Sequence, residues 1–260
     1  FSTSRDLDDV DGYGEKTTTS TYYGDGGFRQ IYAGIGYKPI KSLSVGLNLN
    51  YIWGDYQHSS TVSYSDATIQ SLSRTYKASI NVPTIDLGLQ YEYQYDKKNK
   101  FVLGLTYGMG QKVNQRATFI NSQSGGNSTG EADTVYVGNA FQLPHTVAVG
   151  LSWNQENRWV VGVDYSIQFW EKCRFPWLKT NGVSSSYAVG TGHLRNRHKI
   201  VAGAQYTPNP RGYKYKDHIS YRAGVSYATP YTKVGHGNDG PEYYMVSAGV
   251  ALPIVNKYSN

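Results

Sequence analysis

Charge and cysteine are scarce in this sequence of 260 residues. Charged residues make up 17 % of it, whereas an ordinary soluble domain has about 25 %. The single cysteine, Cys173, cannot form an internal disulfide, and a lone thiol says little about the compartment. The low charge fraction therefore argues against an ordinary cytosolic enzyme, and no disulfide framework is expected within the chain.

Long apolar runs are also missing. No stretch reaches the roughly 18 apolar residues of a membrane-spanning helix, and the mean hydropathy is −0.52. Residues 1–11 are polar and acidic, so no secretory leader opens the chain; if the protein is exported, residue 1 lies well inside the precursor. The net charge of +6 comes from scattered Lys and Arg without a basic tract. We assign it to loops, lumen or anionic lipid head groups, and expect no nucleic-acid partner.

Aromatic residues and glycine are abundant, with 25 Tyr, 7 Phe, 5 Trp and 29 Gly. A transmembrane β-barrel reconciles this composition with the polar average, because every second residue of its strands meets lipid and the others do not. A soluble β-sandwich could share the composition. Composition alone therefore leaves both folds open.

Apolar residues recur at every second position in many stretches. The longest alternations occupy 42–53, 85–95 and 159–169, and shorter ones surround 31–37, 101–109, 147–153, 200–206, 219–227 and 244–252. A helix would turn positions two apart to nearly opposite sides, so these stretches are predicted strands. Their apolar faces carry aromatics mostly near the strand ends, as in the interfacial girdles of a barrel. The opposite faces are rich in Gly, Ser, Asn and Gln, which suits a crowded lumen better than a water-facing sheet.

The connections alternate between short and long. Short turns are predicted at 39–41, 96–100 and 155–157 and a medium one at 207–216, between long polar segments near 55–70, 120–133, 171–190 and 230–240. Outer-membrane barrels have this arrangement, with tight periplasmic turns and longer outer loops. The alternation requires 70–95 to form one strand, although its apolar phase slips at Val82-Pro83. We interpret the slip as a β-bulge, where Pro is tolerated.

Together these patterns predict an all-β fold, an antiparallel transmembrane barrel with about nine strands in this chain. The expected strands are 28–39, 42–55, 70–95, 100–119, 134–154, 157–171, 191–206, 217–229 and 241–254. Residues 1–27 are expected to form an outer loop segment, 28–254 the barrel strands and loops, and 255–260 the start of a periplasmic turn. Bacterial barrels have an even number of strands, so we expect this barrel to be incomplete at both ends.

An ordered set of short motifs resembles the central and C-terminal part of the FadL/OmpP1/TodX family of outer-membrane hydrophobic-compound channels. The motifs are Gly-Tyr-Lys-Pro at 36–39, Leu-Ser-Val-Gly-Leu-Asn at 43–48, Leu-Gly-Leu-Thr-Tyr at 103–107, Leu-Pro-His-Thr-Val-Ala-Val-Gly-Leu-Ser-Trp at 143–153, Val-Asp-Tyr-Ser-Ile-Gln-Phe-Trp at 163–170 and Tyr-Arg-Ala-Gly-Val-Ser-Tyr at 221–227. The resemblance covers about 28–254. It implies a 14-stranded barrel, with three strands before this chain's nine and two after. It also implies a plug, which would precede Phe1, and passage of long-chain fatty acids or similar molecules.

Charges on the predicted inward face are the candidate site residues. They are Lys77, Asp86, Glu92, Asp164 and Arg222. An inward Lys or Arg could pair with the carboxylate of a fatty acid. The alternative is that these charges pair with one another or with the plug, since charge is normal in the lumen of such barrels.

Catalytic and metal-binding patterns were sought and not found. The six His residues lack metal-ligand spacing such as His-Glu-x-x-His, and no Gly-rich turn is followed by the Lys-Ser/Thr of a phosphate loop. Placing Gly12 at the sixth position of an EF-hand puts Leu7 at the first ligand position, so that template fails. An irregular calcium site in this acidic segment stays open beside the default of a solvated loop. We expect no cofactor, no metal and no enzymatic activity.

The leading hypothesis is an outer-membrane channel that admits long-chain fatty acids or other hydrophobic small molecules. The second is a structural or accessory barrel within a larger outer-membrane assembly, and a third is an outer-membrane hydrolase. The expected location is the bacterial outer membrane. The expected partners are membrane lipids, hydrophobic small molecules and, on the second hypothesis, other outer-membrane proteins.

Overall fold

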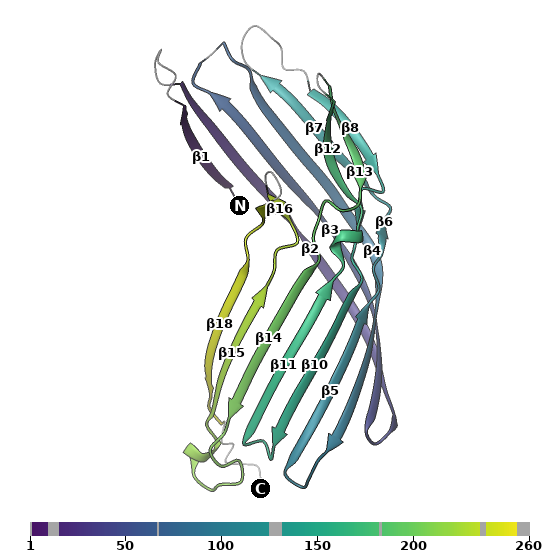
Figure 1. Ribbon diagram of the computed structural model, residues 1–260, viewed down its shortest axis with the longest axis vertical. Coiled ribbons are helices and arrows are strands. Elements are labelled where there is room, and N and C mark those ends of the chain that lie inside the picture. Colours follow the sequence, from purple (N-terminus) through teal and green to yellow (C-terminus); the bar gives the residue numbers. More distant parts are fainter. Residues whose placement is uncertain are drawn as a thin grey trace.

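A curled antiparallel sheet of 12 strands makes up most of the molecule (Figure 1). The computed structural model describes residues 2–9, 16–66, 68–124, 132–181, 184–234 and 238–253. The sheet strands are β1 (Ser2–Asp9), β2 (Lys16–Ile40), β3 (Leu43–Tyr64), β4 (Ser71–Gln94), β5 (Asn99–Gly108), β7 (Arg116–Ser124), β8 (Ala132–Gly138), β10 (Thr146–Gln155), β11 (Trp159–Gln168), β14 (Arg197–Tyr206), β15 (Ser220–Ala228) and β18 (Tyr243–Ala251). Within the described ranges no helix has the length and apolarity needed to cross a membrane.

The strand order follows the chain, as in an up-and-down barrel wall. It runs β1-β2-β3-β4-β5-β10-β11-β14-β15-β18, while β7 pairs with β4 and β8 pairs with β7. Three small ladders lie outside it: β6 (Lys112–Val113) with β9 (Phe141–Gln142), β12 (Phe175–Asn181) with β13 (Ser184–Gly190), and β16 (Lys233–Val234) with β17 (Asn238–Asp239). Two short 3-10 helices, η1 (Trp170–Lys172) and η2 (Tyr215–His218), lie in connections. The all-β antiparallel prediction is confirmed.

Successive connections of the barrel wall lie alternately at the two ends of the molecule. The tight turns after β2, β4 and β10 and the medium connection after β14 lie at one end (Figure 1). The connections at the other end are mostly long, but the one between β3 and β4 spans only 65–70. In outer-membrane barrels the short turns are periplasmic and the long connections are external. In an outer-membrane barrel, the end with β1, β7 and β8 would therefore be the external end.

The longest strands extend well past the length that a membrane requires. β2, β3 and β4 have 25, 22 and 24 residues, whereas about 9–11 residues span a bilayer as a tilted strand. Their upper halves join β1, β7 and β8 in a sheet beyond the barrel wall, which we call the outer sheet. The expectation of irregular outer segments at 1–27, 55–70 and 120–133 is wrong where these strands extend. Ser, Thr and Tyr are common there, and Thr and Tyr favour strands. The expected turn at 255–260 lies outside the described residues.

The predicted bulge at Val82-Pro83 is also wrong. β3 and β4 pair in one uninterrupted register from Leu43↔Tyr91 to Val62↔Leu72. Burial keeps its period of two through the same region, with Val82 and Thr84 buried and Pro83 exposed between them. The strand does not slip. Instead, its apolar residues change face, from the outer face below Pro83 to the inner face above it.

We infer that this change of face marks the external edge of the band that faces lipid. β2, β3 and β4 all change at the register row Arg29↔Trp53↔Asn81. Below that row the outer face carries apolar side chains, which include Ile31, Ile35, Leu49, Tyr51, Leu87 and Leu89. Above it the outer face is polar, as expected where strands leave the lipid chains for head groups and water.

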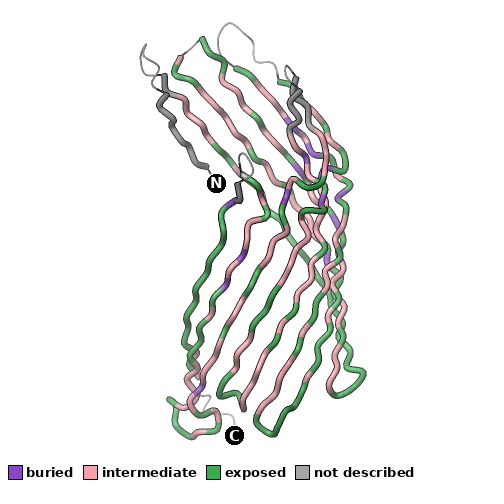
Figure 2. Tube along the Cα trace, in the orientation of Figure 1, coloured by how far each residue is buried: buried purple, intermediate pink, exposed green. Residues whose placement is uncertain are grey.

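Buried residues gather mainly where the outer sheet joins the barrel wall (Figure 2). Ala117, Phe119 and Ala140 form a small core, against which Tyr76, Val135, Val137, Phe141 and Val189 pack. The rest of the sheet is a single layer, so most of its residues are half-buried or exposed. The inner face of the outer sheet is therefore the main place where apolar side chains are packed away from solvent.

Candidate functional site

The inner face of the barrel wall holds Asp86 within a chain of polar groups. Asn50 Nδ2 donates to Asp86 Oδ2 at 2.7 Å, and Gln30 Nε2 donates to Asn50 Oδ1 at 2.9 Å. These three residues come from β4, β3 and β2, and Asn50 is only 6 % exposed. A carboxylate that accepts a short amide hydrogen bond is held in place without any ligand.

Glu92 is paired with two lysines near the end with short turns. Lys38 Nζ lies 3.3 Å from Glu92 Oε1, and Lys100 Nζ lies 3.6 Å from Glu92 Oε2. The bridges connect the ends of β2, β4 and β5. All three side chains are substantially exposed, so the pairs position the strand ends and add little stability.

Asp164 and Arg222 lie on the inner face but far from the other two. The Asp164 carboxylate lies over Gly150 on the neighbouring strand, where any side chain would clash with it. Arg222 Nε donates to Gln205 Oε1 at 2.8 Å. β4 and β15 are five strand spacings apart in the sheet order, which is about 24 Å along the wall. The structure therefore distributes these charges over the wall and does not bring them together at one ligand site.

Lys77 lies on the opposite face of the wall, so its inward placement is corrected. It is an odd-numbered residue of β4, whereas Asp86 and Glu92 are even-numbered, and the register between them is unbroken. It is exposed, and the next residue, Ala78, is 5 % exposed. The inward assignment depended on the bulge at Val82-Pro83, which the strand does not contain.

An aromatic cluster occupies the inner face of the outer sheet, and sequence reasoning missed it. Tyr76 contacts Phe119, Tyr56 and Phe141 with ring-centroid distances of 4.6, 5.4 and 5.8 Å, and Phe141 reaches Phe175 at 6.1 Å. Burial raises the pKa of Tyr56 to about 12 and also raises the pKa of Tyr76, because it disfavours the phenolate. The even spacing of Tyr76 and Ala78 was visible in the sequence but was assigned to lipid.

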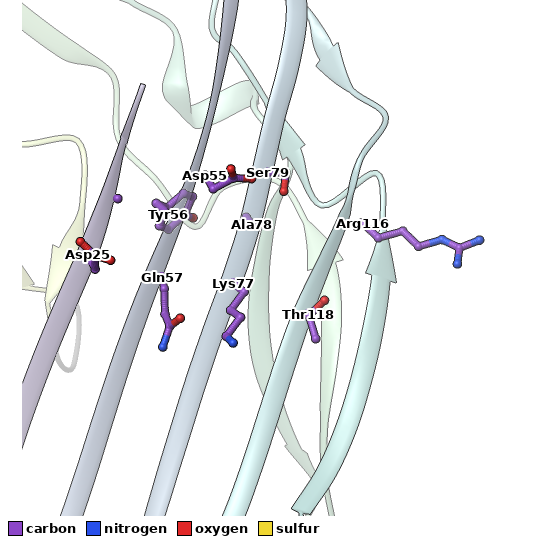
Figure 3. Close-up of a pocket in the computed structure, with 10 residues that line it drawn as sticks. Asp25, Asp55, Tyr56, Gln57, Lys77, Ala78, Ser79, Arg116 and Thr118 are labelled. Atoms are coloured by element: carbon purple, nitrogen blue, oxygen red, sulfur yellow. The ribbon is translucent and has the colours of Figure 1, made fainter. Parts of the chain in front are cut away.

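A hollow of about 350 Å³ lies on the outer face of the outer sheet and was also missed. We call it the wall hollow. It is lined by Asp25, Gly26, Asp55, Tyr56, Gln57, Lys77, Ala78, Ser79, Arg116 and Thr118. Asp25, Gln57, Lys77 and Thr118 form one register row across β2, β3, β4 and β7. Figure 3 shows Gln57, Lys77 and Thr118 side by side on neighbouring strands, and the Arg116 side chain extending away from them at the edge of the hollow.

The described part of the chain does not gather the side chains of a metal centre. The described residues contain no group of three or more His, Cys, Asp or Glu placed to hold a metal ion. Cys173 is 2 % exposed, and burial raises its pKa to about 11, so its thiol stays protonated. The side chains of the acidic segment 6–12, where an irregular calcium site stayed open, lie outside the described residues.

Comparison with solved structures identifies the fold as that of outer-membrane hydrophobic-compound channels. CymD, described as a monoaromatic hydrocarbon channel, matches with a TM-score of 0.55 and 17 % identity, over 98 % of this chain and 78 % of its own. The toluene transporter TbuX of Ralstonia pickettii matches with a TM-score of 0.51 and 14 % identity, over 86 % of this chain and 70 % of its own. The resemblance to the FadL family is thus confirmed at the level of the fold.

The family match is more specific than the match of the fold. Residues 5–260 match the family model BamG, and the chain therefore belongs to the BamG family. No curated protein matches the sequence. The chain therefore has the fold of the hydrophobic-compound channels but belongs to the BamG family.

Proposed function

We propose that this chain is an accessory barrel of a larger outer-membrane assembly, the BAM complex to which its family name refers. The observation that carries the proposal is the BamG match over residues 5–260. On this proposal the protein resides in the bacterial outer membrane and contributes a structural surface. It carries out no covalent catalysis and needs no cofactor.

The interior of the barrel wall supports an accessory role. On its inner face Gln30, Asn50 and Asp86 satisfy one another, and Glu92 is paired with lysines. Above them the aromatic cluster packs against Ala117 and Ala140. A hydrophobic solute passing along this face would have to disrupt packed rings or cross a polar network, and both cost free energy.

A channel for hydrophobic small molecules is the second candidate, and the fold likeness to CymD and TbuX favours it. Substrate would then pass along the same inner face, and long-chain fatty acids are the class that the family resemblance implies. Under this alternative the aromatic cluster would act as a gate that must open.

Affinity purification from the native outer membrane separates the two candidates. The accessory proposal expects other outer-membrane barrels to co-purify with the tagged full-length protein in a fixed ratio. It also expects unchanged uptake of fatty acids and monoaromatic compounds after gene deletion. Isolation of the protein alone, together with an uptake defect that the intact gene restores, would replace the accessory proposal with the channel.

A further inference from the structure

The wall hollow lies just beyond the external edge of the membrane band. That edge is the row Arg29↔Trp53↔Asn81, and the hollow occupies the next two rows, which contain Gly27↔Asp55↔Ser79 and Asp25↔Gln57↔Lys77. These rows lie about 7 and 13 Å further along the strands. With a strand tilt of about 40°, their heights above the edge are about 5 and 10 Å. The head-group layer is about 5–8 Å thick on each side of a bilayer. The lower row therefore lies within it and the upper row lies just outside it, within reach of long side chains.

Glycine creates the hollow. Gly27 is the β2 member of the row that contains Asp55, and it has no side chain to fill the space. Gly26 has φ +122° and Gly54 has φ +152°, which few other residues adopt. A side chain at either position would clash with the backbone of the paired strand. The strands therefore approach closely here and leave a depression on the outward side.

Opposite charges line opposite sides of the hollow. Asp25 and Asp55 lie on β2 and β3, whereas Lys77 and Arg116 lie on β4 and β7. Within the described residues, none of these four side chains has an ion-pair partner at salt-bridge distance. Polar groups of Gln57, Ser79 and Thr118 lie between them. Asp55 and Lys77 lie one strand spacing apart, about 5 Å, whereas Asp25 and Arg116 at the two sides of the hollow lie three spacings apart, about 14 Å.

We propose that the wall hollow binds a zwitterionic lipid head group that carries a phosphate and a primary ammonium. Lys77 and Arg116 contact the phosphate, for which charge-assisted hydrogen bonds are well suited. Asp25 and Asp55 accept hydrogen bonds from the ammonium. The acyl chains of the lipid then lie against the apolar wall below Trp53. Such a site would serve an accessory barrel and a channel equally, so it does not depend on which function is correct.

Native mass spectrometry of the full-length protein with matched lipids tests this site. The probes are phosphatidylethanolamine, phosphatidylglycerol and phosphatidylcholine with identical acyl chains. We expect one tightly retained phosphatidylethanolamine, held about tenfold more strongly than the other two. Phosphatidylglycerol lacks the ammonium, and phosphatidylcholine has one without N–H donors. Equal retention of all three lipids would overturn the proposal.

Two double variants test the proposed phosphate contacts and the proposed ammonium contacts separately. K77Q/R116Q is expected to lose the tightly held lipid, because the phosphate contacts are removed. D25N/D55N is expected to favour phosphatidylglycerol over phosphatidylethanolamine, because the acidic side no longer attracts an amine or repels an anion. Unchanged selectivity in D25N/D55N would overturn the proposal, since a general basic patch would then explain the binding.

The matched control removes the same charge elsewhere. K214Q/K216Q lies in the exposed connection at the opposite end, and we expect wild-type lipid retention. An equal loss there would overturn the proposal by making the effect one of net charge. Free O-phosphoethanolamine is expected not to displace the lipid at millimolar concentration, because it lacks the apolar contacts. Displacement would overturn the membrane source and indicate a soluble ligand.

Discussion

At the scale of single residues, the inner face of the barrel wall is held by polar side chains that satisfy one another across strands. Asn50 is the clearest example, since it donates to Asp86 and accepts from Gln30 while it is only 6 % exposed. A buried polar group that loses its partner costs more than the hydrogen bond itself contributes. The stability of this part of the wall therefore depends on both hydrogen bonds of Asn50 being present.

Replacement of Asn50 by Ala should destabilise the barrel by about 1–3 kcal/mol, because it leaves Asp86 and Gln30 without their shared partner. Urea unfolding in detergent measures the loss. As a control, Gln90→Ala removes an exposed amide from β4 on the inner face of the wall, the face that also carries Asn50. This variant should have little effect on stability. An equal loss of unfolding free energy in the two variants would mean that the Asn50 hydrogen bonds do not stabilise the barrel.

Asp96 organises the turn between β4 and β5. Its Oδ1 accepts hydrogen bonds from the backbone N–H groups of Lys98 and Asn99, at 2.6 and 2.7 Å. A hydrogen bond from the Asn99 side chain, together with these two backbone bonds, holds the Asp96 pKa below its usual 3.8. A lowered folded pKa means that the stabilising contribution is present above the unfolded pKa and is lost as the pH falls through the folded pKa.

The stability difference between wild type and Asp96→Asn should therefore depend on pH. It should be largest above about pH 5 and should vanish in acid, where both side chains are neutral. Parallel urea titrations across this range provide the measurement. A difference that persists at the acid end would show that shape, and not charge, makes Asp96 suitable for the turn.

At the scale of elements, the long strands β2, β3 and β4 belong to two environments. Their lower halves present apolar side chains outward, and their upper halves present them inward, where Phe119 and Tyr76 form a core. The same ladder of backbone hydrogen bonds continues through both halves. The outer sheet is thus a continuation of the barrel wall with its packing reversed.

Phe119→Ala should loosen the outer sheet while it leaves the membrane part intact. Phe119 is 5 % exposed, and removal of a buried Phe side chain costs about 3–5 kcal/mol locally. Limited proteolysis should then cut within the outer sheet. The difference in gel migration between heated and unheated samples, which reports the folded barrel, should be unchanged. Tyr136→Ala, a matched aromatic truncation at a residue 67 % exposed, should not increase cleavage.

At the scale of the whole molecule, we infer that the register row Arg29↔Trp53↔Asn81 marks the external edge of the membrane. Single-cysteine labelling in a Cys173→Ser background tests it. Thr75→Cys, above the row and beyond the wall hollow, should react rapidly with a membrane-impermeant maleimide, and Leu87→Cys, below the row, should react slowly although Leu87 is 47 % exposed. Both lie on the outer face of β4, so only lipid distinguishes them. Similar rates would place the membrane edge elsewhere.

Much of the fold was predictable because each strand has its own period of two. The number of strands in the barrel wall and the turns at 39–41, 96–100 and 155–157 follow from local pattern. The expected single strands 100–119 and 134–154 are wrong, because each divides into a wall strand and a strand of the outer sheet. The alternation of short and long connections fails at 55–70, most of which is strand. The candidate residues Asp86, Glu92, Asp164 and Arg222 lie on inner-face positions of the strands expected for them, whether or not they serve a ligand. Lys77 was misplaced, because its face depends on register.

The sequence by itself determined which residues form strands and which of their faces is apolar, because side-chain direction alternates along any strand whatever its neighbours. Tertiary structure alone decided what each apolar face touches. At Val82-Pro83 the same change of phase could be a bulge in lipid or a change of environment along a regular strand, and the uninterrupted β3–β4 register settles it. The wall hollow likewise exists only because four strands pair, and a local sequence pattern does not say which strands pair. This pairing brings together Asp25, Asp55, Lys77 and Arg116.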